Sequence, residues 1–249
     1  MKQLSQPDKY KELKEKIISV YETSKKRYGY RRITLALRNN GIVTNHKTVQ
    51  RLMRVIGLFC RVRMKRYNSY KGEIGHTADN LLNRNFKAEK ANEKWVTDVT
   101  EFALFGQKLY LSPILDLYNG EIISFNVSSH PNFAQITDML EKAFQKIPDN
   151  TNLILHSDQG WLYQLKPYQR MLKEKGITQS MSRKGNCLDN AVIENFFGLL
   201  KSELLYLQDF DSIECFKQEL IEYIDFYNNY RIKAKLGGKS PVQFRLKVA

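Results

Sequence analysis

Hydrophobic positions in the first 60 residues recur at helical spacing. From residue 9 to about residue 28 they fall on one face at intervals of three, four and seven, which predicts an amphipathic helix. Residues 31–39 predict a second, short helix that stops at an Asn-Asn-Gly sequence. Asn45 can cap a third helix with its own apolar face. Two short helices joined by a tight, Gly-containing connection outline a helix-turn-helix motif.

The pattern changes after residue 92 to a period of two, with β-branched and aromatic residues. This predicts three strands joined by connections short enough for hairpins, over residues 95–104, 108–118 and 121–129. Further segments follow: a helix over 133–146, a strand over 152–158, a helix over 164–175, a strand over 177–181, and helices over 187–206 and 212–229. This order predicts an α/β fold with a mixed five-stranded sheet, and it resembles the ribonuclease-H-like fold.

The charged residues are distributed unevenly. The chain carries 40 Lys and Arg against 26 Asp and Glu, but its first 70 residues hold 18 basic and only four acidic residues, a net charge of +14. The rest of the chain holds 22 residues of each sign. All the excess positive charge therefore lies with the predicted helix-turn-helix, which favours binding to a polyanion. A solvated, lysine-rich helical surface is the alternative interpretation.

The third predicted helix carries the side chains best placed to contact DNA. Lys47, Arg51 and Arg54 lie on its outward face, where they can reach phosphates or base edges. After this helix the hydrophobic periodicity is lost over residues rich in basic and polar side chains, which is typical of a linker. We therefore predict a basic DNA-binding domain over 1–60, a basic linker over 61–90 and an α/β domain over 91–249.

Composition excludes several other classes of protein. An apolar fraction of 42% and an aromatic fraction of 12% exclude a mostly disordered chain. The chain has no run of 18 apolar residues and no apolar stretch at its start, so we expect a cytoplasmic protein without membrane segments. Cys60, Cys187 and Cys215 are too scattered for a disulfide framework or a zinc finger.

Three acidic residues lie where an α/β active site would place them. Asp98 lies inside the first predicted strand, Asp158 ends the fourth, and Glu194 borders the apolar face of the helix over 187–206. A cluster of carboxylates suits Mg²⁺ or Mn²⁺, which prefer oxygen ligands. Each residue could instead be an ordinary surface or turn carboxylate. Two further acidic residues compete for the same role, Asp116 on the second strand and Asp189, which could stabilise a helix start.

Long sequence blocks occur in a fixed order along the chain: WVTDVTEF, HSDQGWLY, QSMSRKGNCLDNAVIENFFGLLKSE, EYIDFYNNYR and SPVQF. They resemble the signature blocks of DDE transposases, the integrase-core recombinases of bacterial insertion sequences. The OrfB-type transposases of the IS-three group, and its IS-one-fifty branch in particular, are the most similar. The upstream segments YGYRRI and TVQRLMRVIGL resemble the helix-turn-helix region of the same proteins. The interval of 35 residues between Asp158 and Glu194 also matches the family's spacing.

The resemblance implies a ribonuclease-H-like integrase catalytic domain over 91–249 and a Mg²⁺- or Mn²⁺-dependent polynucleotidyl transferase. Asp98, Asp158 and Glu194 would be the catalytic residues and the ligands of two divalent ions. The enzyme would cut the DNA at the ends of an insertion sequence and join the freed 3′-OH to target DNA. It would thus catalyse transposition, a form of DNA integration and recombination.

Several basic residues are expected to contact this DNA. Lys201 stands seven residues after Glu194 and matches the basic residue that these enzymes direct toward the DNA ends, although it could also be a solvated surface residue. Arg183 and Lys184 lie in a basic loop before the catalytic helix, and we expect DNA contact there. The family further implies an upstream OrfA-type partner or fusion segment and a multimer assembled on DNA.

Two other functions are compatible with parts of this pattern. A non-catalytic DNA-binding regulator would use the helix-turn-helix alone, but it would have no reason to retain three such carboxylates. A ribonuclease-H-like nuclease acting on hybrids or junctions would share the metal site but would not need the closing blocks EYIDFYNNYR and SPVQF. His156 could act as a general base, yet two metal ions make one unnecessary, so we interpret it as structural.

Overall fold

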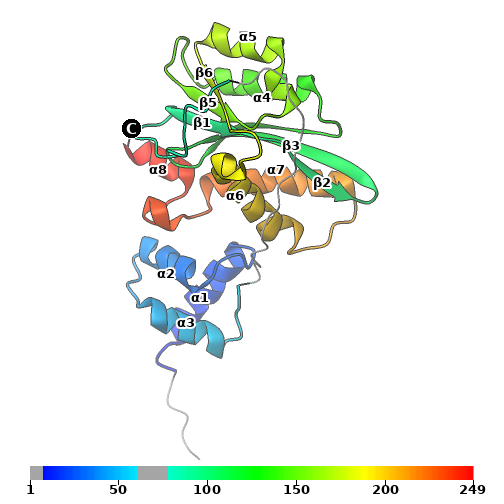
Figure 1. The fold of residues 1–249 in the computed structure, drawn as a ribbon. Coiled ribbons are helices and arrows are strands. Elements are labelled where there is room, and N and C mark those ends of the chain that lie inside the picture. The colour runs from blue at the N-terminus through cyan, green and yellow to red at the C-terminus, as the bar shows by residue number, and fades with distance from the viewer. Residues whose placement is uncertain (1–7, 61–77, 249) are drawn as a thin grey trace, which may run out of the picture. The chain divides into compact units, whose positions relative to one another are not determined.

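The computed structural model describes residues 8–60 and 78–248 (Figure 1). By its contacts the chain divides into two compact units, and the first combines the N-terminal helices with residues Tyr230–Ser240. This grouping differs from the predicted boundaries, which assign 230–240 to the α/β domain. Most of the predicted linker, residues 61–77, lies outside the described residues.

The first unit is built from three helices, α1 (Lys11–Thr23), α2 (Tyr30–Asn39) and α3 (His46–Val55). Asn45 caps α3 as the sequence predicts, because its side chain accepts a hydrogen bond from the Lys47 N–H at 2.9 Å. Residues Tyr230–Ser240, which include the short turn η4 (Ala234–Leu236), complete this unit. Within the unit, the buried Tyr28 hydroxyl accepts a hydrogen bond from the Ile232 N–H at 3.0 Å.

The second unit contains a mixed six-stranded sheet (Figure 1). In this sheet β3 pairs antiparallel with β4 on one side and with β1 and β2 on the other, while β1, β5 and β6 run parallel in succession. The strands are β1 (Lys94–Thr97), β2 (Thr100–Leu104), β3 (Gln107–Asp116), β4 (Ile122–Ser128), β5 (Ile154–Ser157) and β6 (Thr178–Met181). The predicted α/β class with a mixed sheet is confirmed, with six strands because the first predicted strand is divided.

Asp98 lies at this division between β1 and β2, not inside a strand as predicted. β1 and β2 pair with β3 in one continuous register, in which Asp98 lies opposite Pro113. This is a hydrogen-bonded position, because the Leu117 N–H donates to the Lys94 carbonyl and such pairs alternate along the ladder. Proline has no N–H to contribute. The ladder is therefore interrupted at Asp98.

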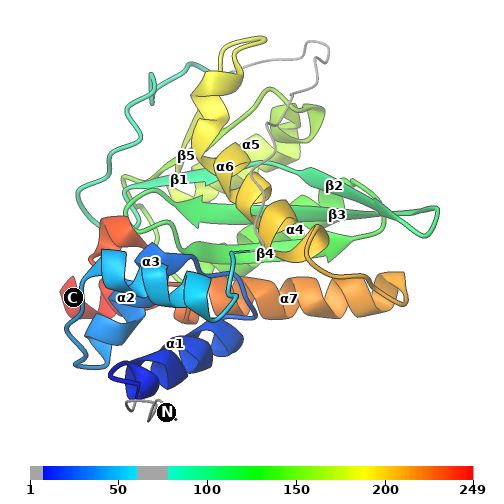
Figure 2. The same cartoon turned by 90° about the horizontal axis from the view of Figure 1, so that it is seen from below.

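Helices cover both faces of the sheet. One face packs against α4 (Phe133–Phe144), α5 (Lys166–Lys175) and the short turn η1 (Trp161–Gln164). Figure 2 shows α6 (Ala191–Leu200) and α7 (Ile213–Asn229) crossing the other face. The predicted helix over 187–206 consists of three segments: a 3₁₀ turn η2 (Cys187–Asn190), α6 and a π-helical segment η3 (Lys201–Leu205). The helix α8 (Pro241–Val248) completes the unit.

Each face has its own hydrophobic core. Buried residues of β2 and β3 pack with α6 and α7 on one side, and Trp95 of β1 packs with α4 and α5 on the other. This two-sided burial fixes the sheet and therefore the ends of its strands. None of the described helices is both long enough and apolar enough to cross a membrane.

Candidate active site

Sheet register brings Asp98 and Asp158 to the same end of neighbouring strands. β1 and β5 are parallel, and Val96 pairs with His156. Each aspartate lies two residues beyond this pair, just past the carboxyl end of its strand. The carboxyl edge of parallel strands is where α/β proteins place their ligands.

Glu194 comes to the same place from the other layer. It lies in the first turn of α6, which packs against β1. Burial and the charge of Asp158 raise the pKa of Glu194. Burial raises the pKa of Asp98 well above its ordinary value, the charges of Asp158 and Glu194 raise it further, and the Lys201 ammonium opposes them. The three carboxyl groups thus lie within electrostatic reach of one another.

Two of these carboxylates are held by backbone N–H groups. Asp98 accepts a hydrogen bond from the Val99 N–H at 2.7 Å, and Asp158 accepts one from the Gly160 N–H at 2.8 Å. As they stand, no three His, Cys, Asp or Glu side chains of the described residues form a group that could hold a metal ion. The donor set nevertheless fits a hard divalent cation, because three mutually repelling carboxyls gain stability when a cation neutralises them.

The competing carboxylates have arginine partners instead. Asp116 is fully buried and accepts hydrogen bonds from the Asn92 N–H at 2.9 Å and from Arg245 at 2.8 Å. Arg245 belongs to α8, so this pair fastens the C-terminal helix to the end of β3. Asp116 therefore serves the fold.

Asp189, in the turn η2, binds the loop before α6. Its side chain has no exposed surface, and it forms a bidentate pair with Arg183, with N···O distances of 2.8 and 2.9 Å. It also accepts hydrogen bonds from Arg84 at 3.0 Å and from Asn80 at 2.8 Å. These bonds hold the pKa of Asp189 far below its ordinary range.

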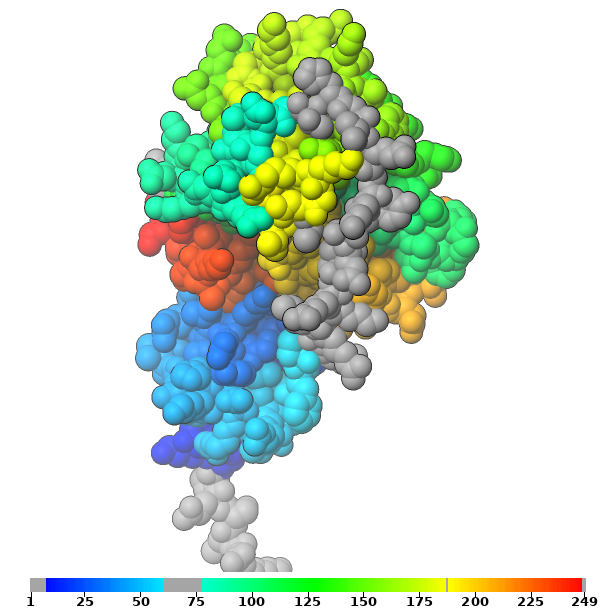
Figure 3. Space-filling model, in the orientation of Figure 1, coloured from blue at the N-terminus to red at the C-terminus, as the bar shows by residue number. Residues whose placement is uncertain are grey.

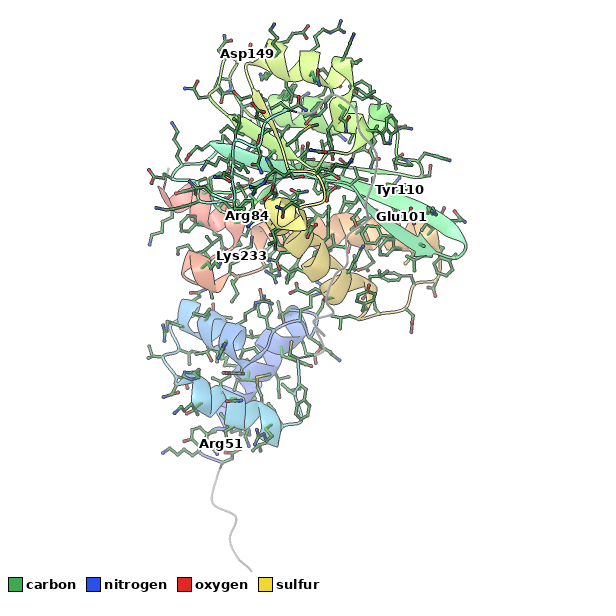
Figure 4. The ribbon with its side chains drawn as sticks, viewed as in Figure 1. Arg51, Arg84, Glu101, Tyr110, Asp149 and Lys233 are labelled. Carbon is green, nitrogen blue, oxygen red and sulfur yellow. The ribbon has the colours of Figure 1, made fainter. Side chains whose placement is uncertain are left out.

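The segment that contains Arg84 therefore packs beside the loop before α6. Figure 3 shows residues 78–93 against the loop around residues 183–190, and Figure 4 places Arg84 beside η2. Residues 78–90 belong to the predicted linker, yet Leu82 is buried in the hydrophobic core. This part of the segment is thus folded onto the α/β unit.

Lys201 lies where α6 changes to the π-helical segment. Burial lowers the pKa of Lys201, while the charges of Glu101 and Asp98 raise it. Its ammonium nitrogen is 5.5 Å from the centre of the Phe102 ring. Glu101 in turn accepts hydrogen bonds from Lys108 at 3.1 Å and from the Tyr110 hydroxyl at 2.8 Å, on the β2–β3 hairpin of Figure 4. The structure thus brings Lys201 into the electrostatic surroundings of Asp98.

The other predicted DNA contacts lie apart from the carboxylates in sequence. Lys184 is exposed in the loop before η2. Lys47, Arg51 and Arg54 are exposed on α3 of the first unit. The Arg51 guanidinium lies 5.1 Å from the centre of the Tyr10 ring, and Figure 4 shows Arg51 on α3.

His156 is a structural residue, as the sequence predicts. It is fully buried, and its ring nitrogens contact the Ser180 hydroxyl at 2.8 Å and the Asp189 carbonyl at 3.1 Å. Burial lowers its pKa to about 4, so the ring is neutral near neutral pH. A neutral imidazole with both nitrogens engaged has no free position for a substrate proton.

Sequence reasoning missed three polar residues beside this site. Tyr163, Tyr168 and Asn190 are buried. Among the described residues, neither Tyr hydroxyl and neither polar atom of the Asn190 side chain has a partner within ordinary hydrogen-bond geometry, although the Thr97 side chain lies near the Tyr163 hydroxyl. Tyr163 belongs to the block HSDQGWLY, which is the signal that could have drawn attention to it.

Comparisons with known proteins find matches to both the N-terminal and the α/β parts of the chain. Models of the integrase core domain match residues 88–187 and 194–248, and a model of an HTH-like domain matches residues 9–66. The chain is 54% identical to a putative transposase of insertion sequence element IS150 from Escherichia coli K12, over 98% of this chain and 87% of that protein. It is 51% identical to an uncharacterized transposase-like protein from Haemophilus influenzae, over 86% of this chain and 98% of that protein.

Among solved structures, the chain resembles the catalytic core domain of HTLV-2 integrase in complex with magnesium. The TM-score is 0.52 at 18% identity, and the match covers 64% of this chain and 99% of that chain. At this identity the likeness concerns the fold alone, and it supports the ribonuclease-H-like class inferred from the order of elements.

Proposed function

The chain belongs to the integrase-core transposases of bacterial insertion sequences, in the IS3 group, and from that premise we propose that Asp98, Asp158 and Glu194 form its catalytic metal site. The reaction class follows from the family: the protein is a polynucleotidyl transferase that carries out transposition by DNA strand transfer. The observation that carries the site proposal is the electrostatic coupling of three carboxyls at the carboxyl end of β1 and β5.

The ligand set defines what the residues of this chain do. Two Mg²⁺ or Mn²⁺ ions would supply Lewis-acid stabilisation to the attacking and departing oxygens of an in-line phosphoryl displacement. Asp98 and Asp158 would hold the ions from the sheet, in orientations limited by the Val99 and Gly160 N–H groups. Glu194 would close the site from α6.

Lys201 has two tasks in this proposal. When no cation is bound, its charge partly offsets the repulsion around Asp98. Its ammonium would also contact a phosphate of the transposon end. Arg183 and Lys184 would contact DNA from the neighbouring loop, with the half-exposed Arg183 guanidinium shared between Asp189 and DNA.

The first unit would hold DNA through Lys47, Arg51 and Arg54, which are exposed on α3. A helix of this kind lies in the major groove in helix-turn-helix proteins, where exposed basic side chains meet phosphates and base edges. We further propose that the protein acts as a multimer on DNA together with an OrfA-type segment.

Neutralising the site carboxylates one at a time tests the assignment. Asp98→Asn, Asp158→Asn and Glu194→Gln should each abolish cleavage and strand transfer while end-DNA binding persists. The triple variant should be hardly worse than each single one, since the three groups act as a unit. Asp138→Asn, which changes an exposed carboxylate paired with Lys142, is the matched control and should stay active. Near wild-type strand transfer by Glu194→Gln would remove that residue from the site.

The DNA-binding role of α3 is tested by its salt dependence. Replacing Lys47, Arg51 and Arg54 together by Gln should flatten the slope of log affinity against log salt. The slope should fall by about 0.9 for each DNA phosphate that these side chains neutralise in the wild-type complex. An unchanged slope would show that these side chains do not meet the DNA backbone.

A further inference from the structure

Two buried tyrosines lie beside the carboxylates without hydrogen bonds of their own. Tyr163 is 2% exposed and Tyr168 is fully buried. Neither hydroxyl has a partner within ordinary hydrogen-bond distance and angle among the described residues, although the Thr97 side chain lies near enough to Tyr163 to lower its pKa slightly. Buried polar groups in native proteins are nearly always paired, so two adjacent exceptions need an explanation.

Their place in the fold connects them to Asp158. Tyr163 lies in η1, the turn that begins three residues after Asp158, and its ring packs against the Tyr168 ring with centres 5.5 Å apart. A methyl group built on Gly160 would lie 2.8 Å from the Asp158 Oδ1 atom and 3.4 Å from the Tyr163 Cδ2 atom. The carboxylate oxygen and the ring carbon are thus separated by no more than the sum of these two distances.

The electrostatics agree with this geometry. After burial, the largest contribution that raises the pKa of Tyr163 is the charge of Asp98, followed by that of Asp158. Burial also raises the pKa of Tyr168, and there the contributing charge is that of Asp158. Both phenols therefore stay protonated and are available as donors near these two carboxylates.

We propose that Tyr163 and Tyr168 are positioning residues of the metal site, which donate hydrogen bonds to Asp98 and Asp158 respectively when these carboxylates hold a divalent cation. This inference rests on the proposed function. Without a cation, each carboxylate has an oxygen engaged by a backbone N–H, at Val99 and Gly160. With a cation bound, the repulsion between the carboxylates would be smaller, and each phenol would hold the carboxylate oxygen that does not face the ion. Hydrogen bonds of this kind orient metal ligands and strengthen metal affinity.

Tyr-to-Phe substitutions in the full chain test the proposal in two states. Thermal melts in a chelator report the metal-free protein, and titration calorimetry with Mn²⁺ reports metal affinity. Tyr168→Phe and Tyr163→Phe should leave the metal-free melting temperature unchanged or raise it, because neither substitution removes a hydrogen bond in that state. The same substitutions should weaken Mn²⁺ binding about 10-fold to 100-fold.

Tyr223→Phe is the matched control. The Tyr223 hydroxyl is also buried, but it donates to Glu203 at 3.0 Å, so its removal should lower the metal-free melting temperature and leave Mn²⁺ affinity intact. The proposal would be overturned if the Tyr163 and Tyr168 variants, like this control, melted at a lower temperature and kept their Mn²⁺ affinity. Unchanged Mn²⁺ affinity would overturn it whatever the melting temperature.

Failure of the underlying function has a different signature. If the wild-type chain bound Mn²⁺ and Asp158→Asn bound it equally well, the ligand assignment would fail before the tyrosines were considered. If Asp158→Asn lost Mn²⁺ binding while Tyr168→Phe kept it, the positioning role alone would be wrong.

Discussion

Asp189→Asn is expected to destabilise the protein by loosening the loop that leads into α6. The substitution is almost isosteric, but it removes the negative charge that holds Arg183 and Arg84. It also turns one acceptor oxygen into an NH₂ group that faces donors. The carboxylate accepts five hydrogen bonds, from the Asn80 side chain, Arg84, and the backbone and guanidinium of Arg183.

The size of the effect follows from burial on both sides of the pair. Removing one partner of a fully buried ion pair costs about 3–5 kcal/mol. Here the carboxylate has no exposed surface, whereas the Arg84 and Arg183 side chains are 46% and 50% exposed, so water compensates part of the effect. We therefore expect the free energy of unfolding to fall by about 3 kcal/mol at neutral pH, at the lower end of that range.

The same variant has a defined pH dependence. The pKa of Asp189 is lowered in the folded protein, so its stabilisation is fully present above its unfolded pKa, about 3.9, and is lost as pH falls toward the folded value. The difference between wild type and Asp189→Asn should therefore be constant near neutral pH and shrink in acid.

Urea denaturation of the metal-free protein at several pH values measures this difference. Glu174→Gln is the control, because its pair with Arg170 is exposed on both sides and should contribute less than about 0.5 kcal/mol. A destabilisation of under about 1 kcal/mol for Asp189→Asn, or a difference that persists unchanged in acid, would refute the reasoning.

Three further predictions concern residues in and around the proposed metal site. Gly160→Ala should weaken Mn²⁺ binding, because the added methyl group would lie 2.8 Å from an Asp158 oxygen. The fold should stay intact by circular dichroism, because the backbone angle of Gly160 (φ −58°) suits alanine. Normal Mn²⁺ binding by the variant would contradict this prediction. Asp98→Asn should stabilise the metal-free protein near neutral pH. The pKa of Asp98 is raised in the folded protein, so wild-type stability is lost as pH rises above the pKa of Asp98 in the unfolded chain. Thermal melts in chelator from pH 4 to 8 check this, and a variant no more stable than wild type is the contrary result. Lys201→Ala should weaken end-DNA binding while Mn²⁺ affinity is kept or slightly increased, and Lys201→Arg should partly restore DNA binding. Separate titrations with Mn²⁺ and with end DNA measure the two affinities. Impaired Mn²⁺ binding with normal DNA affinity is the opposite outcome.

Periodicity was sufficient to predict the main features of the fold and the place of Asp158 at the end of its strand. A strand followed by an acidic residue is a local pattern that leads directly to the carboxyl edge of the sheet. The interruption at Asp98 could not be found in this way, because it depends on Pro113 across the ladder. Likewise, nothing local to Asp189 indicates that Arg84, 105 residues earlier, is its partner.

The same limit applies to the ends of the chain. Residues 230–240 follow directly after α7 in the sequence, yet they group with the N-terminal helices, where Tyr28 and Asn39 bind their backbone. Local pattern gives no reason to separate these residues from the α/β unit. The change from α to π geometry at Lys201 is also absent from the pattern, because the hydrophobic spacing continues through it.

The pairing of acidic residues explains why only some carboxylates in this region are suited to a cation. Asp116 and Asp189 are buried, and each is neutralised by arginine, so a metal ion would have to displace a guanidinium that already satisfies them. In the described part of the chain no arginine is paired with Asp98, Asp158 or Glu194. Burial raises the pKa of all three, and the neighbouring carboxylates raise those of Asp98 and Glu194 further. The proposed metal site would explain why such an unfavourable cluster is kept, and the arginine pairs of Asp116 and Asp189 stabilise the surrounding segments. Arginine pairing thus distinguishes the carboxylates that hold the fold together from those left available to a divalent ion.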